Sequence, residues 1–143
     1  GRQAGEGETG RGGTGELCGG GHGEGAPDSV AVCKSRGGGG MPVSAFWSTE
    51  GSWQVMMEPN PFIHTTTTGG GPLACSAAIA AINVTLEERL WEQAAEKGTY
   101  FKSKLQELAT QYPQIYKNVT GKGLLIGQHF HNPETGYKVA AGL

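Results

Sequence analysis

The chain has no long apolar run, no excess of positive charge and few cysteines, and each absence removes a class of function. No stretch approaches the roughly 18 apolar residues that a membrane helix needs, and no charged-then-apolar leader follows Gly1. Eleven lysines and arginines against 13 aspartates and glutamates give a net charge of −2, which offers no basic surface to nucleic acid or anionic lipid. We therefore expect a cytoplasmic protein with neither nucleic-acid nor membrane partners.

The three cysteines are odd in number and far apart, and they form no CxxC pair; they are Cys18, Cys33 and Cys75. This usage is typical of a reduced cytosolic protein with free thiols and not of a disulfide scaffold. Cys18 with His22, and His129 with His131, have spacings that could seat two metal ligands each. A structural zinc site needs four ligands and neither pair has a matching second pair, so we predict no metal site.

Glycine is concentrated at the start of the chain, where residues 1–40 hold 16 of the 26 glycines. Each glycine adds backbone entropy that folding must overcome, so this segment alone would be flexible. It nevertheless contains a short apolar run over 28–33, which Pro27 introduces and the glycine cluster 37–40 ends. We predict one buried strand there and a second over 41–49.

The rest of the chain alternates helical and strand patterns. An alanine-rich run over 72–82, opened by a proline, predicts a helix that is apolar on most sides and therefore buried. Apolar residues recur every three or four positions over 94–112 and predict an amphipathic surface helix that Pro113 ends. Residues 124–130 predict a strand, 132–136 a turn, and 137–143 an element cut short. The order indicates an α/β fold, with too few strands to cover both helices, so we expect a piece of a larger protein.

A GxGxxG pattern spans Gly10 to Gly15 and raises the possibility of a dinucleotide site. Such a site requires an apolar strand before the glycines and a helix after them, and neither pattern is present. A nucleotide-binding module therefore ranks last among the functions that we consider.

Two local features could carry chemistry. Lys34 follows an apolar strand and precedes a glycine cluster, and a partly desolvated lysine there could become a nucleophile that forms a Schiff base, although most lysines at strand ends are exposed charges. His64 precedes four threonines, a segment that could either turn the chain or bind a phosphate group. The residues alone leave this second choice open.

Four segments, in order, resemble motifs of the class III aminotransferases. Residues 58–75 (EPNPFIHTTTTGGGPLAC) resemble the loop HTTTFGGNPLA, and residues 27–42 (PDSVAVCKSRGGGGMP) resemble the run PDIVxxxKALGGGxMP that carries the cofactor lysine. Residues 6–15 (EGETGRGGTG) are similar to DEVQTGMGRTG, and 121–125 (GKGLL) to the GKG segment that opens the small domain. The resemblance covers essentially all of the chain.

This resemblance implies a fragment of the fold-type I architecture, an α/β fold with a mostly parallel sheet. Residues 1–88 would belong to the large domain that binds pyridoxal 5′-phosphate, and 89–143 would form the connecting helix and the start of the small C-terminal domain. Lys34 would form the Schiff base with the cofactor and move the proton of the substrate carbon. Thr67 would bind the cofactor phosphate of a neighbouring subunit, and Glu8 would lie near the ring hydroxyl. The full-length enzyme is expected to be at least a homodimer.

The chain departs from the family pattern at several of these positions. Gly5 stands in place of the aspartate that pairs with the pyridine nitrogen and keeps it protonated. Glu8 replaces a glutamine, Gly13 an arginine, Thr68 an aromatic residue and Gly71 an asparagine. The glycine-containing phosphate loop and the aromatic residue that stacks on the cofactor ring precede this region in the family. We therefore expect little or no transaminase activity from the isolated chain.

The resemblance is strongest to the putrescine (diamine) type, which would move an amino group from putrescine to a 2-oxo acid, 2-oxoglutarate above all. The alternatives within the family are acetylornithine, ornithine and 4-aminobutyrate aminotransferases. A different alternative is a non-catalytic remnant. Gly5 distinguishes the two classes, because a carboxylate at that position would favour the enzyme and a glycine favours the remnant.

Overall fold

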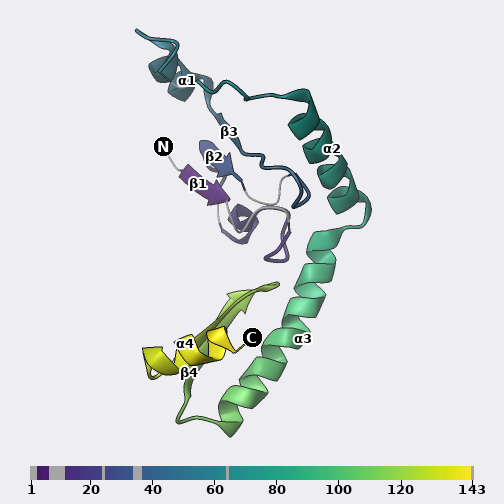
Figure 1. Cartoon of the computed structure of the whole chain (residues 1–143), viewed down its shortest axis with the longest axis vertical. Coiled ribbons are helices and arrows are strands. Elements are labelled where there is room, and N and C mark those ends of the chain that lie inside the picture. The colour runs from purple at the N-terminus through teal and green to yellow at the C-terminus, as the bar shows by residue number, and fades with distance from the viewer. Residues whose placement is uncertain (1–2, 7–11, 24, 34–36, 64, 143) are drawn as a thin grey trace.

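The computed structural model describes residues 3–6, 12–23, 25–33, 37–63 and 65–142. Figure 1 shows two β-structures on the same side of a pair of consecutive helices, α2 (Pro72–Glu87) and α3 (Leu90–Gln111). The upper structure is a sheet of β1 (Gln3–Glu6), β2 (Ser29–Val32) and β3 (Ala45–Ser48). The lower one is a hairpin of β4 (Tyr116–Lys122) and β5 (Leu125–Phe130), followed by α4 (Pro133–Ala141).

The three-stranded sheet is mixed, with order β1-β2-β3. β1 and β2 are parallel, with Gly5 paired with Ala31. β2 and β3 are antiparallel, with Ala31 paired with Phe46. Val30 and Val32 of β2 are buried, with 6% and 4% of their surface exposed. The apolar run therefore forms the predicted strand, while β3 occupies only the last part of the predicted 41–49 because residues 37–41 make a glycine turn closed by a Gly37–Met41 bridge.

Two short helices follow strands of this sheet and were not predicted. A 3-10 helix, η1 (Gly19–His22), lies between β1 and β2. Helix α1 (Glu50–Met57) follows β3, and its Trp53 ring meets Phe46 edge-on with 5.5 Å between the ring centroids. α1 has no buried residue, so its weak apolar pattern gave the sequence little to indicate a helix.

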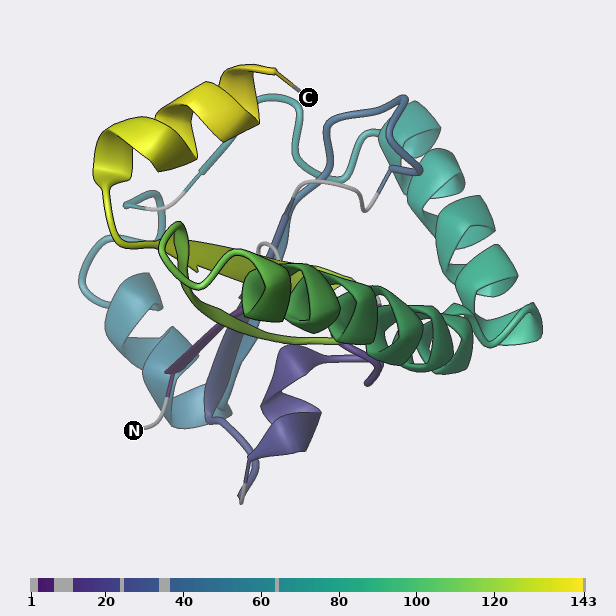
Figure 2. The same ribbon diagram turned by 90° about the horizontal axis from the view of Figure 1, so that it is seen from below.

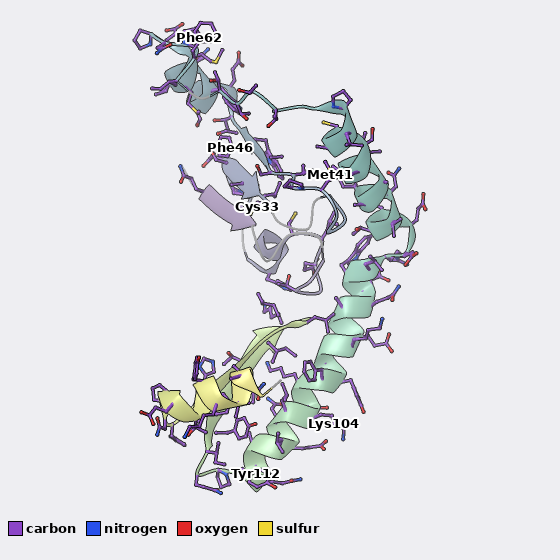
Figure 3. The ribbon with its side chains drawn as sticks, in the orientation of Figure 1. Cys33, Met41, Phe46, Phe62, Lys104 and Tyr112 are labelled. Carbon is purple, nitrogen blue, oxygen red and sulfur yellow. The ribbon has the colours of Figure 1, made fainter. Side chains whose placement is uncertain are left out.

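The prediction that the alanine-rich helix is buried is wrong for the structure described. α2 begins at Pro72 as predicted, and only Thr85 among its residues is buried. Leu73 is 71% exposed and Ile79 60% exposed, because α2 packs along its length on few other elements (Figure 1). Phe62, next to α1, also lies at the outer end of the molecule and is 77% exposed (Figure 3).

The amphipathic helix is confirmed, and it begins at Leu90, four residues before the predicted start. Arg89 adopts a left-handed conformation between α2 and α3 and forms an ion pair with Glu92 in the first turn of α3. Ala94 and Gly98 are its buried residues; Gly98 faces Gly123 of the C-terminal structure, and the neighbouring Trp91 and Ala95 face the segment before η1. On the exposed face, the Glu107 carboxylate accepts hydrogen bonds from Lys104 and raises the pKa of that lysine.

The hairpin packs along α3, as the view from below shows (Figure 2). Val119 of β4 is 4% exposed, and the rings of Tyr116 and Phe130 lie 4.9 Å apart across the two strands. β5 matches the predicted strand, whereas β4 was not predicted. The predicted turn at 132–136 is wrong, because Asn132 caps α4 by accepting a hydrogen bond from the Glu134 amide and Pro133 takes the first helical position.

The two β-structures meet α3 at a contact between backbones. Gly98 of α3 lies against Gly123, which follows β4, so closely that a Cβ on Gly98 would be 2.0 Å from the Gly123 carbonyl oxygen. Gly123 also touches the backbone of Thr14, and the Leu124 amide donates to the Gly13 carbonyl at 2.7 Å. The GKG segment (121–123) and Leu124 therefore hold the hairpin turn, α3 and the segment around Thr14 against one another.

Candidate functional site

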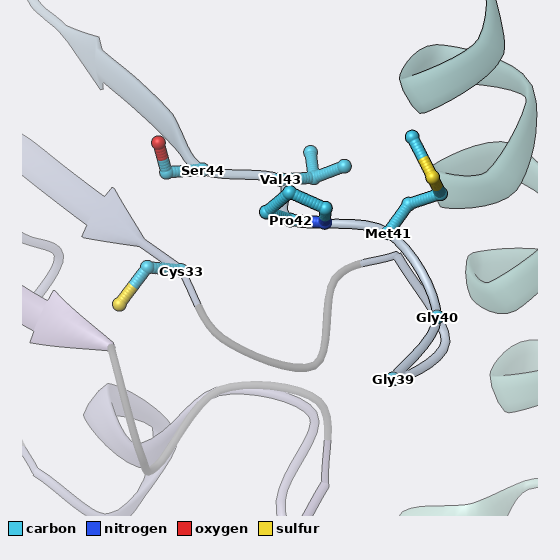
Figure 4. A pocket seen from close by; sticks show the side chains of 7 residues that line it. All are labelled: Cys33, Gly39, Gly40, Met41, Pro42, Val43 and Ser44. Atoms are coloured by element: carbon cyan, nitrogen blue, oxygen red, sulfur yellow. The ribbon is translucent and has the colours of Figure 1, made fainter.

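The candidate site lies where β2 ends. Because β1 and β2 are parallel, their carboxyl ends point to the same edge of the sheet, the edge at which ligands bind in open α/β sheets. A cavity of about 680 Å³ opens there, lined by Cys33 and residues 39–44. Figure 4 shows Cys33 at the end of β2 and Met41 across the cavity, with the Met41 side chain turned toward α2.

The cavity is suited to a small ligand, but the described part of its wall carries no charged side chain. Its volume is within the roughly 300–1,000 Å³ of small-molecule pockets, and Gly39 and Gly40 leave their part of the wall without side chains. Of its described lining residues, Cys33 is the only one with an ionisable side chain, a free thiol. A phosphate group in this region would therefore need cations from outside the described wall, which itself offers the Ser44 hydroxyl.

Gly5 lies one strand away from the cavity wall, in register with Ala31. Gly5 and Ala31 are both exposed, so this row of the sheet faces open space. A Cβ built on Gly5 would meet nothing within 4 Å. The backbone could therefore carry an aspartate at this position without moving, and what the site lacks is the carboxylate and not the room for it.

The sequence-predicted site residues are only partly placed. Lys34 and Glu8 lie outside the described residues, although Cys33, the residue before Lys34, lines the cavity. Thr67 is exposed on the segment between α1 and α2 and does not line this cavity. Thr68 and Gly71 form a turn in which the Gly71 amide donates to the Thr68 carbonyl at 3.2 Å before α2 begins.

The glycine pattern at 10–15 has a packing role in its described part. Gly12 has a positive φ of 85°, and a Cβ there would lie 2.8 Å from the Cβ of Trp91 on α3. No helix follows Gly15 directly, because η1 begins only at Gly19. A pyrophosphate would find no helix N-terminus at this loop, so the structure gives the dinucleotide reading no support.

The histidine and cysteine pairs serve other contacts. The His22 Nε2 lies 3.0 Å from the Thr14 carbonyl oxygen, and the His129 Nε2 lies 2.8 Å from the Thr120 hydroxyl. Within the described ranges, no group of three or more histidine, cysteine or acidic side chains could hold a metal ion. The described helices include none that is both long and apolar enough to cross a membrane.

Comparison with known proteins decides the family. The model of the family "Aminotransferase class-III" matches residues 4–141. The chain belongs to the class III aminotransferases. These are enzymes that depend on pyridoxal phosphate, which is therefore the ligand to expect for the family site.

Solved structures agree with this assignment to the class III aminotransferases. The acetylornithine aminotransferase of Elizabethkingia anophelis is 32% identical with a TM-score of 0.83, and the match covers 95% of this chain and 34% of that one. The ornithine aminotransferase of Plasmodium yoelii is 35% identical (TM-score 0.80; 91% and 33% covered), and an omega-transaminase of Thermomicrobium roseum is 29% identical (TM-score 0.81; 94% and 30% covered). The predicted α/β fold of fold-type I is confirmed, and this chain spans about a third of the length of these enzymes.

Proposed function

We propose that this chain is the part of a class III aminotransferase that holds pyridoxal phosphate covalently through Lys34. The observation that carries the proposal is that Cys33, which follows β2, lines a cavity of about 680 Å³, and that Lys34 is the next residue in the sequence. A solved neighbour, the ornithine aminotransferase of Toxoplasma gondii, has pyridoxal phosphate at partial occupancy at its active site. Residues 1–88 would form part of the cofactor domain and 89–143 the connecting helix and the start of the small domain.

Each residue of this site would have a distinct task. Lys34 would bind the cofactor and transfer a proton at the substrate carbon through its amine. Gly39 and Gly40 would let the ligand approach the backbone, and Thr67 and Glu8 would contact the cofactor from the neighbouring subunit and from beside the ring. The cofactor supplies an electron sink for the substrate carbanion. Because Gly5 has no carboxylate, this chain would not hold the ring nitrogen protonated, and it would bind the cofactor better than it uses it.

The substrate class follows from what the family members share. Two of the relatives are named for acetylornithine and ornithine. These two compounds, and the diamine putrescine that we favour, all carry a primary amine at the end of an unbranched chain. We propose putrescine as the amino donor and 2-oxoglutarate as the acceptor for the whole enzyme. Ornithine or acetylornithine is the second candidate, favoured by those two relatives.

We also propose that the whole enzyme is a cytoplasmic homo-oligomer. The support is the apolar surface of α2, where Leu73, Ile79 and Ile82 are each more than 40% exposed. Several large apolar side chains left exposed around one helix are typical of a surface that another chain or another part of the same chain covers.

The first experiment measures cofactor attachment in the purified chain. Pyridoxal phosphate is added, the visible absorption of the Schiff base is recorded, and borohydride reduction followed by peptide mapping locates the modified lysine. We expect the label on Lys34 and its loss in Lys34→Ala, whereas Lys97→Ala, an exposed lysine of α3, should keep it. Label spread evenly over the lysines, with no change in Lys34→Ala, would refute the site.

A second variant distinguishes an enzyme from a non-catalytic remnant. Gly5→Asp places a carboxylate where the structure leaves open space, so the fold should tolerate it. We expect Gly5→Asp to change the absorption spectrum of the bound cofactor and to speed exchange of the substrate α-proton with solvent by at least about tenfold, equal to about 1.4 kcal/mol. Gly5→Asn is the matched control without the charge. Equal behaviour of the Asp and Asn variants would favour the remnant.

A further inference from the structure

A second cavity lies away from the cofactor site, where α3 meets the segment around Thr14 and the turn between β4 and β5. Its volume is about 560 Å³. The lining residues that matter for its chemistry are Thr14, His22, Thr99, Lys102, Ser103 and Lys122. Figure 1 shows these three parts of the chain converging beside the middle of α3.

The charge of this cavity is opposite to that of the chain. Lys102 and Lys122 line it together with His22, and none of its described lining residues is acidic. The whole chain, in contrast, carries a net charge of −2. A cleft lined by charges of one sign focuses the electrostatic field within it. The positive potential of this cavity therefore attracts anions, although the molecule as a whole is negatively charged.

The position of Lys102 is fixed by the fold. Its ammonium group donates a hydrogen bond to the Gly121 carbonyl oxygen at 3.0 Å, which holds the charge at the cavity wall. An ammonium group has three hydrogens, so two remain for a ligand. The close contact of Gly98 with Gly123 keeps the turn and α3 in register around this lysine.

Thr14 supplies the observation that points to a ligand. The residue is 5% exposed, and its hydroxyl is the one buried side-chain oxygen that lacks a hydrogen-bond partner among the residues described. The backbone around this residue is held in place, because the Leu124 amide donates to the Gly13 carbonyl and the His22 ring lies 3.0 Å from the Thr14 carbonyl oxygen. Buried polar groups are almost always hydrogen-bonded, and an orphan commonly marks the place of a bound ion or water.

The other hydroxyls of this cavity are already engaged. Thr99 donates to the Ala95 carbonyl at 2.8 Å, and Ser103 donates to the Tyr100 carbonyl at 2.7 Å. Among the described hydroxyls of this wall, that of Thr14 is therefore the one without a hydrogen-bond partner. Two ammonium groups and one free hydroxyl match a group that carries nearly two negative charges and several acceptor oxygens.

We propose that this cavity binds a phosphate group, either free or as a phosphomonoester. Lys102 and Lys122 neutralise the phosphate, which carries about −1.5 to −2 charges at neutral pH, and the Thr14 hydroxyl donates to one of its oxygens. The site does not involve Lys34 and is independent of the cofactor. Phosphate bound there stabilises the junction of the three parts of the chain, because it binds the folded state alone.

The test measures the melting temperature of the Lys34→Ala chain, which cannot attach the cofactor covalently at the proposed site, in inorganic phosphate against chloride at equal ionic strength. We expect a saturable rise in phosphate alone. Lys102→Met should weaken the apparent phosphate affinity by at least about tenfold, as loss of a charge-assisted hydrogen bond does. Lys97→Met, an exposed lysine of α3 that contacts Gln93 and does not line the cavity, is the matched control.

Two further variants separate binding from folding. Lys122→Met removes a charge from an exposed position and should weaken phosphate binding without loss of the fold. Thr14→Val should abolish most of the phosphate response and leave the melting temperature in chloride unchanged or higher, because it removes an unsatisfied hydroxyl. Glycerol 3-phosphate shows whether the site takes a phosphomonoester or free phosphate. A rise in melting temperature as large as that with inorganic phosphate indicates a phosphomonoester, and a smaller rise indicates free phosphate. An equal rise in phosphate and chloride, or an equal loss in Lys97→Met and Lys102→Met, overturns the proposal.

Discussion

The sheet of β1–β3 and the assembly of α3, the hairpin and α4 are stabilised in different ways. In the sheet, buried apolar contact comes from Val30 and Val32, and glycine-rich segments surround them. The C-terminal assembly is stabilised by paired aromatic rings, a buried valine and a capped helix, and Gly98, Gly121 and Gly123 lie where backbones touch. The proposed cofactor lysine belongs to the first region, so the chemistry is placed where side-chain packing is sparse and a bound ligand has most to add.

Of the substitutions that test this comparison, Gly98→Val is expected to cause the largest loss of stability. Its Cβ would overlap the Gly123 carbonyl, so α3 and the turn must separate, and we expect a loss of about 3 kcal/mol in the free energy of unfolding. Glu96→Val at an exposed position carries the helix-propensity cost without the clash and should lose less than about 1 kcal/mol. Urea unfolding of both variants measures the difference. Similar losses would show that this contact does not hold α3 and the hairpin together.

A matched pair of valines compares the two regions directly. Val119 in β4 and Val32 in β2 are both 4% exposed, so each loses the same methyl groups on substitution by alanine. We expect Val119→Ala to lower the free energy of unfolding by about 2 kcal/mol and Val32→Ala by about 1 kcal/mol. The loss at Val32 is smaller because the glycine-rich backbone around it can move in to fill the space that the methyl groups leave. Chemical denaturation with a probe in each region measures both. A larger cost for Val32→Ala would mean that the sheet is as tightly packed as the hairpin.

The smallest of these effects is expected at helix caps. Asn132→Ala removes the side-chain oxygen that accepts from the Glu134 amide and should cost about 1 kcal/mol. Thr49 precedes α1 without a capping hydrogen bond, so Thr49→Ala should stay within about 0.5 kcal/mol. Thermal unfolding resolves the two, and the cap is unimportant if both variants melt together.

The elements that were predicted correctly are those whose pattern is local and strong. β2 and α3 follow from an apolar run between turn signals and from a 3.6-residue apolar period. β4 was missed because its residues are mostly polar and exposed, with Val119 as the buried exception. The turn prediction at 132–136 failed because asparagine followed by proline favours both a turn and the start of a helix, and only contact with the hairpin decides between them.

The candidate site could be predicted only in part. The position of Lys34 after an apolar strand pointed to the cavity edge, because the carboxyl end of a strand is a local feature. The role of the glycines near Thr14 could not be predicted, since it depends on residues of α3 and of the β4–β5 turn that lie about 80 to 110 positions later in the chain. Long-range contacts of this kind leave no periodic trace in the sequence.

The contact between Gly98 and Gly123 also limits how this chain can vary. The clash that any side chain on Gly98 would cause is with a carbonyl oxygen, and every amino acid at position 123 has that oxygen. No replacement at one position can therefore compensate for a larger residue at the other. Across related sequences we expect the two glycines to be retained separately and not to covary, unlike a pair of packed side chains whose volumes can be exchanged.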